Sequence, residues 1–266
     1  MSTSRTVPDN HWLGDRQRLA AAYGASLGII RIELVSLALR QMLPATGARV
    51  LDIGGGGGLL AVSLARHGHE TVIIDADAAM LDRARGLLET ETAEVGARVT
   101  LIHGRGEDAA GLVDGAFDAV NCDSVLMYVS DPEPMIRAMV GLAADDGVLS
   151  VVSVNPDAWA MRSGLQGRWR EAIDKLANDH YSTDIYLHNE RHPRSRIEEL
   201  LSRHGAEPEQ WFGVGVFTDH IAGPVVANEP AEVIEAEWLA GRTSPYRDIA
   251  RCYHIIARKR RPPGPD

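Results

Sequence analysis

The chain has 266 residues, of which 45% are hydrophobic, and a formal net charge of −10 at pH 7. This acidic balance argues against a general affinity for nucleic acids, because such binding depends on Lys and Arg neutralising phosphates. No stretch approaches the roughly 18 to 20 apolar residues of a membrane-spanning helix, and residues 1–17 lack the apolar middle of a secretory signal. We therefore expect a cytoplasmic protein with no membrane partner.

The spacing of cysteine and histidine predicts no metal site. Cys122 and Cys252 form neither a metal-ligand pattern nor a disulfide framework, so we expect both to pack in the interior. His188 and His192 have i,i+4 spacing, but Pro193 disfavours the helix that would place them on one face. We assign no metal.

The first half of the chain alternates between apolar strand patterns and amphipathic helix patterns. Residues 14–43 carry apolar residues at helical spacing with an interruption near Gly24 to Gly28, which predicts two helices. After them the pattern predicts strands at 48–54, 70–77, 98–104, 117–126 and 148–154 and helices at 59–68, 78–91 and 132–143. This alternation is typical of a parallel sheet wound with right-handed crossovers.

The pattern changes after Asn155. Residues 157–193 show little periodicity, and we interpret them as a lid insertion after the fifth strand. The pattern then predicts a helix at 195–205, a strand at 211–217, a helix at 229–241 and a strand at 252–259. The predicted organisation is an N-terminal helical cover (1–43), a Rossmann-like core (44–156), the lid (157–193) and the C-terminal part of the core (194–266).

The stretch "VLDIGGGGG" (50–58) places five glycines where a strand turns into a helix. Such a turn lets the backbone approach a ligand closely, and the next helix offers unpaired N–H groups. A phosphate-binding P-loop would need Gly-Lys-Ser/Thr, which does not follow. Gly56, Gly58 and Ala61 do satisfy the dinucleotide pattern G-x-G-x-x-A, so an NAD-dependent oxidoreductase remains an alternative.

Asp52 favours a different cofactor. A carboxylate at this turn would repel a diphosphate, whereas it would attract the ammonium group of a methionine moiety. Asp75 follows Gly54 by about twenty positions, which suits hydrogen bonds to both ribose hydroxyls of a nucleoside. That distance fits dehydrogenases equally, so it supports the fold more than the cofactor.

Seven stretches in chain order carry a resemblance to a known family: "YGASLGIIR", "VLDIGGGGG", "IIDADAAMLDRA", "VLMYVSDP", "GVLSVVSVN", "FGVGVFTDH" and "YHIIARK". From Tyr23 to Lys259 the chain resembles class I S-adenosylmethionine-dependent methyltransferases, within them the bacterial tRNA carboxymethoxyuridine methyltransferases. The resemblance implies a doubly wound α/β fold with a seven-stranded, mostly parallel sheet. It also implies a set of cofactor-binding residues, which we expect to be Arg31, Asp52, Gly54, Gly55, Gly56, Gly58, Asp75, Ala76, Glu107, Asp108 and Asp123. In this set Arg31 would meet the carboxylate of the cofactor, and one of the two acids after the third strand would approach the adenine amino group.

Two departures from that group affect the expected acceptor. Residues 157–210 hold eight Lys or Arg against ten Asp or Glu, where tRNA-modifying members carry a run of lysines. The group's His-Asp-Tyr after the sixth strand becomes Thr218, Asp219 and His220. Both changes leave recognition of a modified uridine without its usual residues.

Methyl transfer from a sulfonium is an in-line displacement, so holding the acceptor, methyl and sulfur on one line is the protein's main task. A base is needed only if the acceptor must lose a proton, and a carboxylate acceptor needs none. Asp123 ends the fourth strand beside the expected methyl position. The candidate catalytic residues are Asp123, Tyr23, Tyr181, Tyr186 and His188.

We therefore predict a methyltransferase that acts on a small organic acceptor. The alternative within the family is a tRNA wobble uridine that bears a carboxymethoxy group. From other classes, the NAD-dependent oxidoreductase and a binding module without turnover stay open. The sequence does not determine the oligomeric state.

Overall fold

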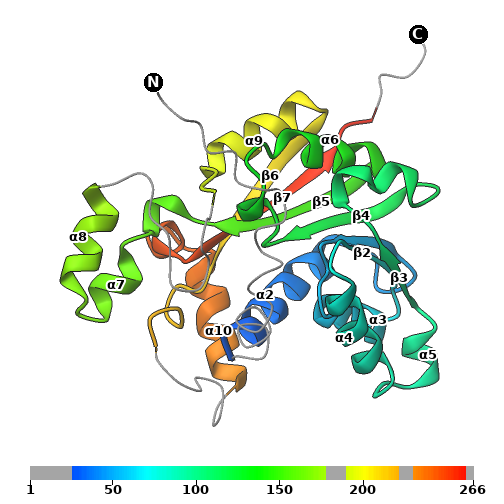
Figure 1. Cartoon of the computed structure of the whole chain (residues 1–266), viewed down its shortest axis with the longest axis horizontal. Helices are drawn as coiled ribbons and strands as arrows, with labels where there is room; N and C mark the ends of the chain where they lie inside the picture. Colours follow the sequence, from blue (N-terminus) through cyan, green and yellow to red (C-terminus); the bar gives the residue numbers. More distant parts are fainter. Residues whose placement is uncertain (1–25, 178–189, 222–229, 262–266) are drawn as a thin grey trace.

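The computed structural model describes residues 26–177, 190–221 and 230–261. Within them, one seven-stranded sheet runs in the order β3-β2-β1-β4-β5-β7-β6, and β7 is antiparallel to its neighbours β5 and β6 (Figure 1). The strands are β1 Arg49–Ile53, β2 Glu70–Asp75, β3 Val99–His103, β4 Phe117–Asp123, β5 Ala143–Val154, β6 Ala206–Val214 and β7 Cys252–Lys259. The predicted doubly wound α/β fold with a mostly parallel sheet is confirmed.

Helices cover both faces of the sheet. The α-helices are α2 Ser26–Met42, α3 Leu59–Arg66, α4 Ala78–Leu88, α5 Ala93–Gly96, α6 Glu133–Leu142, α7 Met161–Leu165, α8 Trp169–Ala177, α9 Arg194–Arg203 and α10 Pro230–Gly241. The 3-10 helices are η2 Gly106–Gly111, η3 Leu126–Tyr128, η4 Pro156–Ala158 and η5 Tyr246–Ile249. In the part of the chain that is described, no helix is both long enough and apolar enough to cross a membrane.

Two cores separate the helices by face. On one face, α6 and α9 pack against Leu51, Val120 and Leu149 of the central strands. On the other face, α2, α3 and α10 pack against Val50, Ala119 and neighbouring apolar residues (Figure 1). Because strands covered on both faces need apolar side chains in both directions, these segments read as continuous hydrophobic runs.

Several predicted boundaries were wrong by a few residues. Gly28 lies inside α2 rather than in a break, because one glycine costs a buried helix only about 1 kcal/mol. The fourth strand ends at Asp123, and residues 126–128 turn into η3. The fifth strand begins at Ala143, five residues before the predicted start at 148, and includes Asp145 and Asp146, with an irregularity opposite β4.

The segment after β5 contains two short helices, α7 and α8, which Figure 1 shows beyond the end of the sheet. Trp159 is buried there, with 2% of its surface exposed. Trp169, at the start of α8, is 68% exposed. Whether the insertion opens and closes as a lid stays a prediction, and its residues 178–189 lie outside the described part.

The glycine turn gives a direct test of this backbone. Gly54 has a φ of 69°, and a Cβ added to it would lie 2.2 Å from Val125 Cγ2. Gly57 has no such φ, and its nearest neighbour would be Arg83 Cβ at 3.9 Å. We expect Gly54→Ala to lower the free energy of unfolding by about 2 kcal/mol and Gly57→Ala to change it by less than about 0.5 kcal/mol. Urea denaturation of the unliganded protein measures both values, and equal losses would contradict the observed turn.

Candidate functional site

The turn after β1 is built for close approach to a ligand. The Gly54 N–H donates to the Ile74 carbonyl at 2.7 Å, and the Gly56 N–H donates to Asp75 Oδ2 at 2.8 Å. A Cβ on Gly55 would lie only 2.6 Å from Asp52 Oδ2. The turn is therefore fixed by its neighbours, and a side chain at Gly55 would fill the space above the Asp52 carboxylate.

Asp52 lies under this turn with 2% of its surface exposed. Burial raises the pKa of its carboxyl to about 7, the hydrogen bond from Asn121 lowers it, and the charges of Asp123 and Asp75 raise it further. The Asn121 Nδ2 group donates to Asp52 Oδ1 at 2.7 Å. Three carboxyl groups thus act on one another at the ends of three neighbouring strands, and a cation placed among them would be favoured.

Asp75 ends β2 with its side chain held by the backbone. Oδ2 accepts from Gly56, and Oδ1 accepts from the Asp77 N–H at 2.8 Å. Burial raises its pKa, while these two backbone hydrogen bonds lower it. Ala76 follows directly, and its carbonyl lies 3.1 Å from His103 Nε2. The Asp75 carboxylate is therefore fixed at the end of β2, where we predicted hydrogen bonds to the ribose of a nucleoside.

Asp123 ends β4 and forms an ion pair with Arg31 of α2, with Arg31 Nε 3.2 Å from Asp123 Oδ2. The Ser124 hydroxyl donates to Asp123 Oδ1 at 2.7 Å, and Ser124 itself has a φ of 60°. The helix before β1 thus brings Arg31 beside Asp123, and the predicted contact of Arg31 with the cofactor's carboxylate stays a prediction. One contact of Arg31 among the described residues is therefore with an acid of the protein.

Glu107 and Asp108 lie at the start of η2, beyond β3. Arg105 Nε donates to Glu107 Oε1 at 2.8 Å, and Asp108 is exposed. Because β3 lies next to β2 and parallel to it, η2 begins at the same edge of the sheet at which Asp75 ends β2. The predicted adenine contact stays a prediction.

Several predicted site residues fall outside the described part, namely Tyr23, Tyr181, Tyr186 and His188. His192, which has i,i+4 spacing with His188, is described. It is buried, and its Nε2 lies 2.9 Å from the Val129 carbonyl oxygen. Within residues 26–177, 190–221 and 230–261, no group of three His, Cys, Asp or Glu could hold a metal ion.

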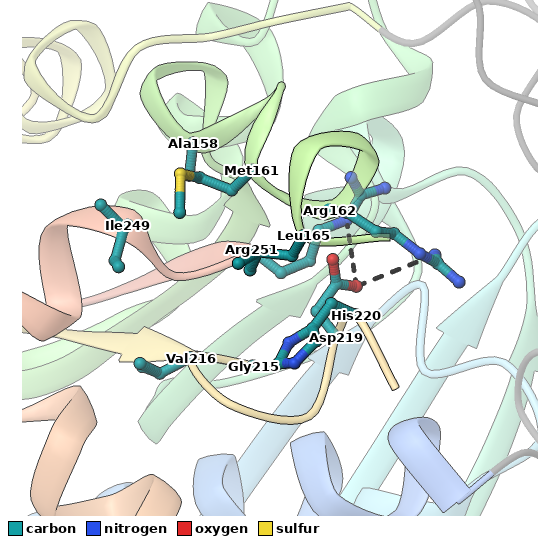
Figure 2. Close-up of a pocket in the computed structure, with 10 residues that line it drawn as sticks. All are labelled: Ala158, Met161, Arg162, Leu165, Gly215, Val216, Asp219, His220, Ile249 and Arg251. Carbon is teal, nitrogen blue, oxygen red and sulfur yellow. Dashed lines mark ion pairs between the residues drawn. The ribbon is translucent and has the colours of Figure 1, made fainter. Parts of the chain in front are cut away.

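A pocket opens between α7 and the segment after β6 (Figure 2). Arg162 and Arg251 both point at Asp219, and Figure 2 marks the two ion pairs. Arg162 Nη1 and Arg251 Nε lie 3.9 and 3.8 Å from the same atom, Asp219 Oδ1. Both distances exceed a hydrogen bond, so neither guanidinium donates to this carboxylate. The pocket is lined by Ala158, Met161, Arg162, Leu165, Gly215, Val216, Asp219, His220, Ile249 and Arg251.

Two polar atoms of this pocket are buried without a hydrogen-bond partner among the described residues. They are Arg162 Nε and His220 Nδ1. Buried polar atoms are nearly always hydrogen bonded in folded proteins. Both atoms are therefore available to hydrogen bond with a polar group in the pocket.

A buried glutamate on α10 fixes the wall of the pocket. Glu237 is 1% exposed and accepts the backbone N–H groups of Val216, Phe217 and Thr218 at 2.8 to 3.0 Å. The Thr218 hydroxyl donates to the same carboxylate at 2.6 Å. Because a charge-assisted bond is roughly twice as strong as a neutral one, this segment is held firmly next to Asp219.

The pocket and the strand ends surround one buried thiol. Burial raises the pKa of Cys252 to about 11, and the charges of Arg251, Arg31, Asp123 and Asp219 all act on it. The Arg31–Asp123 pair and the Arg251–Asp219 pair therefore both lie near Cys252, at the start of β7. The two halves of the candidate site are neighbours.

Sequence reasoning missed the pocket arginines, because isolated arginines give no pattern. It also missed Glu237, which looked like one more acid on an acidic helix. Asn121, Ser150 and His254 did leave a signal, since each interrupts an apolar strand at a position that proves to be buried. An unexplained polar residue in a two-sided buried strand is the sign that would have found them.

Comparisons with known proteins agree with this geometry. Residues 51–151 match a family described as "Methyltransferase domain". The chain is 27% identical over 246 residues to tRNA 5-carboxymethoxyuridine methyltransferase of Escherichia coli, covering 89% of this chain and 91% of that protein. Residues 51–151 are a methyltransferase domain, and the chain has the fold of class I methyltransferases.

Two further relatives place this methyltransferase among enzymes with different acceptors. It is 39% identical over 138 residues to a ubiquinone biosynthesis O-methyltransferase of Xanthomonas axonopodis, covering 51% of this chain and 54% of that protein. The structure of magnesium protoporphyrin IX methyltransferase from Synechocystis with bound SAH matches it with a TM-score of 0.61 and 16% identity. That match covers 91% of this chain and 93% of that one. The residues that match the methyltransferase domain include the glycine turn. The turn therefore belongs to a methyltransferase domain, and the alternative of an NAD-dependent oxidoreductase is set aside.

Proposed function

We propose that S-adenosylmethionine binds across the turn after β1, with its ammonium group beside Asp52 and its ribose hydroxyls beside Asp75. The glycine cradle and the three interacting carboxyls at neighbouring strand ends support this placement. The bound cofactor supplies an electrophilic methyl group on a sulfonium. The protein's residues bind and orient it, with Arg31 and Asp123 closing the side next to the pocket.

The acceptor in this proposal is a small organic molecule with a carboxylate, bound in the pocket of Arg162 and Arg251. One observation carries this choice: two guanidinium groups share a single carboxylate oxygen at about 4 Å, which leaves the pocket with a net positive charge. Arg162 Nε and His220 Nδ1 supply buried polar atoms for the ligand. Guanidinium groups suit carboxylates because their N–H groups match both oxygens.

The residues present suit such an acceptor without a general base. A carboxylate oxygen is already a nucleophile, so methyl transfer would give a methyl ester and S-adenosylhomocysteine with no proton to remove. The hydrogen bonds from Val216 and Thr218 to Glu237 hold the pocket wall. Arg251, which pairs with Asp219, would position the carboxylate of the acceptor. Catalysis would then come from orientation in a pocket that excludes water.

A tRNA 5-carboxymethoxyuridine is the second candidate. The similarity to the Escherichia coli enzyme over most of both chains favours it, and that acceptor also bears a carboxylate. The net charge of −10 and the balance of eight basic against ten acidic residues over 157–210 disfavour it, because a tRNA needs a basic surface.

The role of Asp52 predicts a pH dependence of cofactor binding. Its raised pKa of about 7 means that the carboxyl gains a proton as the pH falls through 7, and an ammonium group prefers the ionised form. We expect the affinity for S-adenosylhomocysteine to rise roughly tenfold from pH 6 to pH 8. The Asp52→Asn variant should bind weakly with no rise over this range. Calorimetry measures both, and a pH-independent affinity in the unsubstituted protein would contradict the proposal.

The acceptor is tested with cofactor labelled in its methyl group. We expect label in base-labile methyl esters when a panel of small carboxylic acids is supplied and no label in bulk tRNA. Arg251→Gln should raise the KM for the active acid about tenfold or more without changing S-adenosylhomocysteine affinity.

Arg168 offers a matched control, because it pairs with Glu171 on α8 and does not line the pocket. Arg168→Gln should leave the KM for the acid unchanged. Incorporation of label into tRNA, or equal KM values for the two variants, would overturn the small-acid proposal.

A further inference from the structure

Four buried polar side chains form a row across the sheet, from Asp52 under the glycine turn to His254 on β7. Asn121 Nδ2 donates to Asp52 Oδ1 at 2.7 Å, and the Ser150 hydroxyl donates to Asn121 Oδ1 at 2.7 Å. His254 Nε2 lies 2.8 Å from Ser150 Oγ. Each of the four side chains is at most 2% exposed.

The sheet register explains why these residues meet. They lie on the four adjacent strands β1, β4, β5 and β7. Asp52 pairs with Asn121, and Asn121 pairs with Ser150, so three of them stand side by side on one face. His254 lies two positions from the residue opposite Ser150, on the same face.

The hydrogen bonds of the row run in one direction. Ser150 has a single hydroxyl proton, and it is used in the bond to Asn121. The remaining bond must then be donated by the Nε2–H of His254. All three bonds therefore point toward Asp52, an arrangement in which each bond strengthens the next.

Stability alone gives no reason for a polar row at this place in the sheet. Its neighbours on the same face are apolar, among them Val50, Ala119, Val148 and Ile256. Replacing a buried polar network by well-packed apolar residues is often neutral or stabilising. The one member that carries a charge is Asp52, and it lies at the cofactor end.

The far end of the row is kept neutral. His254 packs against the ring of Phe212, with centroids 5.7 Å apart, and Phe212 stacks on Trp238 of α10 at 5.2 Å. Burial lowers the pKa of His254 to about 3, so its ring stays uncharged at neutral pH. It donates one hydrogen bond without adding a second charge to the interior.

The row also determines which oxygen of Asp52 faces the glycine turn. Oδ1 is taken by Asn121, whereas Oδ2 lies 2.6 Å from the position of a Cβ on Gly55. We propose that Asn121, Ser150 and His254 are positioning residues that hold the Asp52 carboxylate with Oδ2 toward the cofactor's ammonium group. This inference rests on the proposed role of Asp52 in cofactor binding and is independent of the acceptor.

The test compares two serines of the same strand. Ser150→Ala breaks the row, whereas Ser153→Ala removes a hydroxyl that is equally buried but belongs to the opposite face of β5. We expect Ser150→Ala to weaken S-adenosylhomocysteine binding about fivefold to tenfold and Ser153→Ala to change it less than about twofold, by calorimetry on folded protein. Equal affinities of the two variants would overturn the proposal.

A second measurement needs no variant that must fold. In the unsubstituted protein labelled with ¹⁵N-histidine and bound to S-adenosylhomocysteine, we expect His254 as the neutral tautomer with its proton on Nε2. A proton on Nδ1 would leave Nε2 as an acceptor, so Ser150 would donate to His254. That result would refute the proposed direction of the hydrogen bonds. Asp52→Asn separates the two levels of failure: if it keeps full affinity, the role of Asp52 is itself wrong, and if it alone loses affinity, only the row is wrong.

Discussion

The burial of one carboxylate at the end of β1 constrains this whole site. Asp52 has only the Asn121 amide as a hydrogen-bond partner within the described residues, and its neighbours Asp75 and Asp123 are also acids. Such a group is costly to ionise in the unliganded protein. A bound cation would relieve that cost, so in the proposed binding mode the site gains stability from the positive end of the cofactor. The glycines above it are needed because any side chain at Gly55 would occupy the same space.

The proposed acceptor pocket carries the opposite charge. There two arginines share one aspartate, and buried atoms of Arg162 and His220 lack protein partners. The charge left over in this pocket is therefore positive, whereas the charge left over at the strand ends is negative. The cofactor and a carboxylate acceptor would each bring the sign of charge that its half of the site lacks, and the buried Glu237 holds the wall of the acceptor pocket.

The fold was predictable because its strands are buried on both faces and so stand out as apolar runs between helical patterns. The positions of the glycine turn, Asp52 and Asp75 at strand ends were predictable too, because the apolar runs show where the strands end. Their contacts with the cofactor stay predictions. The pocket was not predictable, because Arg162 and Arg251 lie 89 positions apart and meet only through the antiparallel return of β7. The row of Asn121, Ser150 and His254 needed the strand order, which no local pattern contains.

The central claim is that Asp52 is a buried acid that ionises fully only when the cofactor is bound. Carbon NMR of protein labelled at the aspartate carboxyls measures this directly, with the Asp52 signal assigned from the Asp52→Asn spectrum. The account predicts a titration midpoint near pH 7 in the free protein, as its pKa of about 7 requires. With S-adenosylhomocysteine bound, the midpoint should fall below about pH 6. A midpoint near pH 4 in the free protein, or one that the ligand does not move, would contradict it.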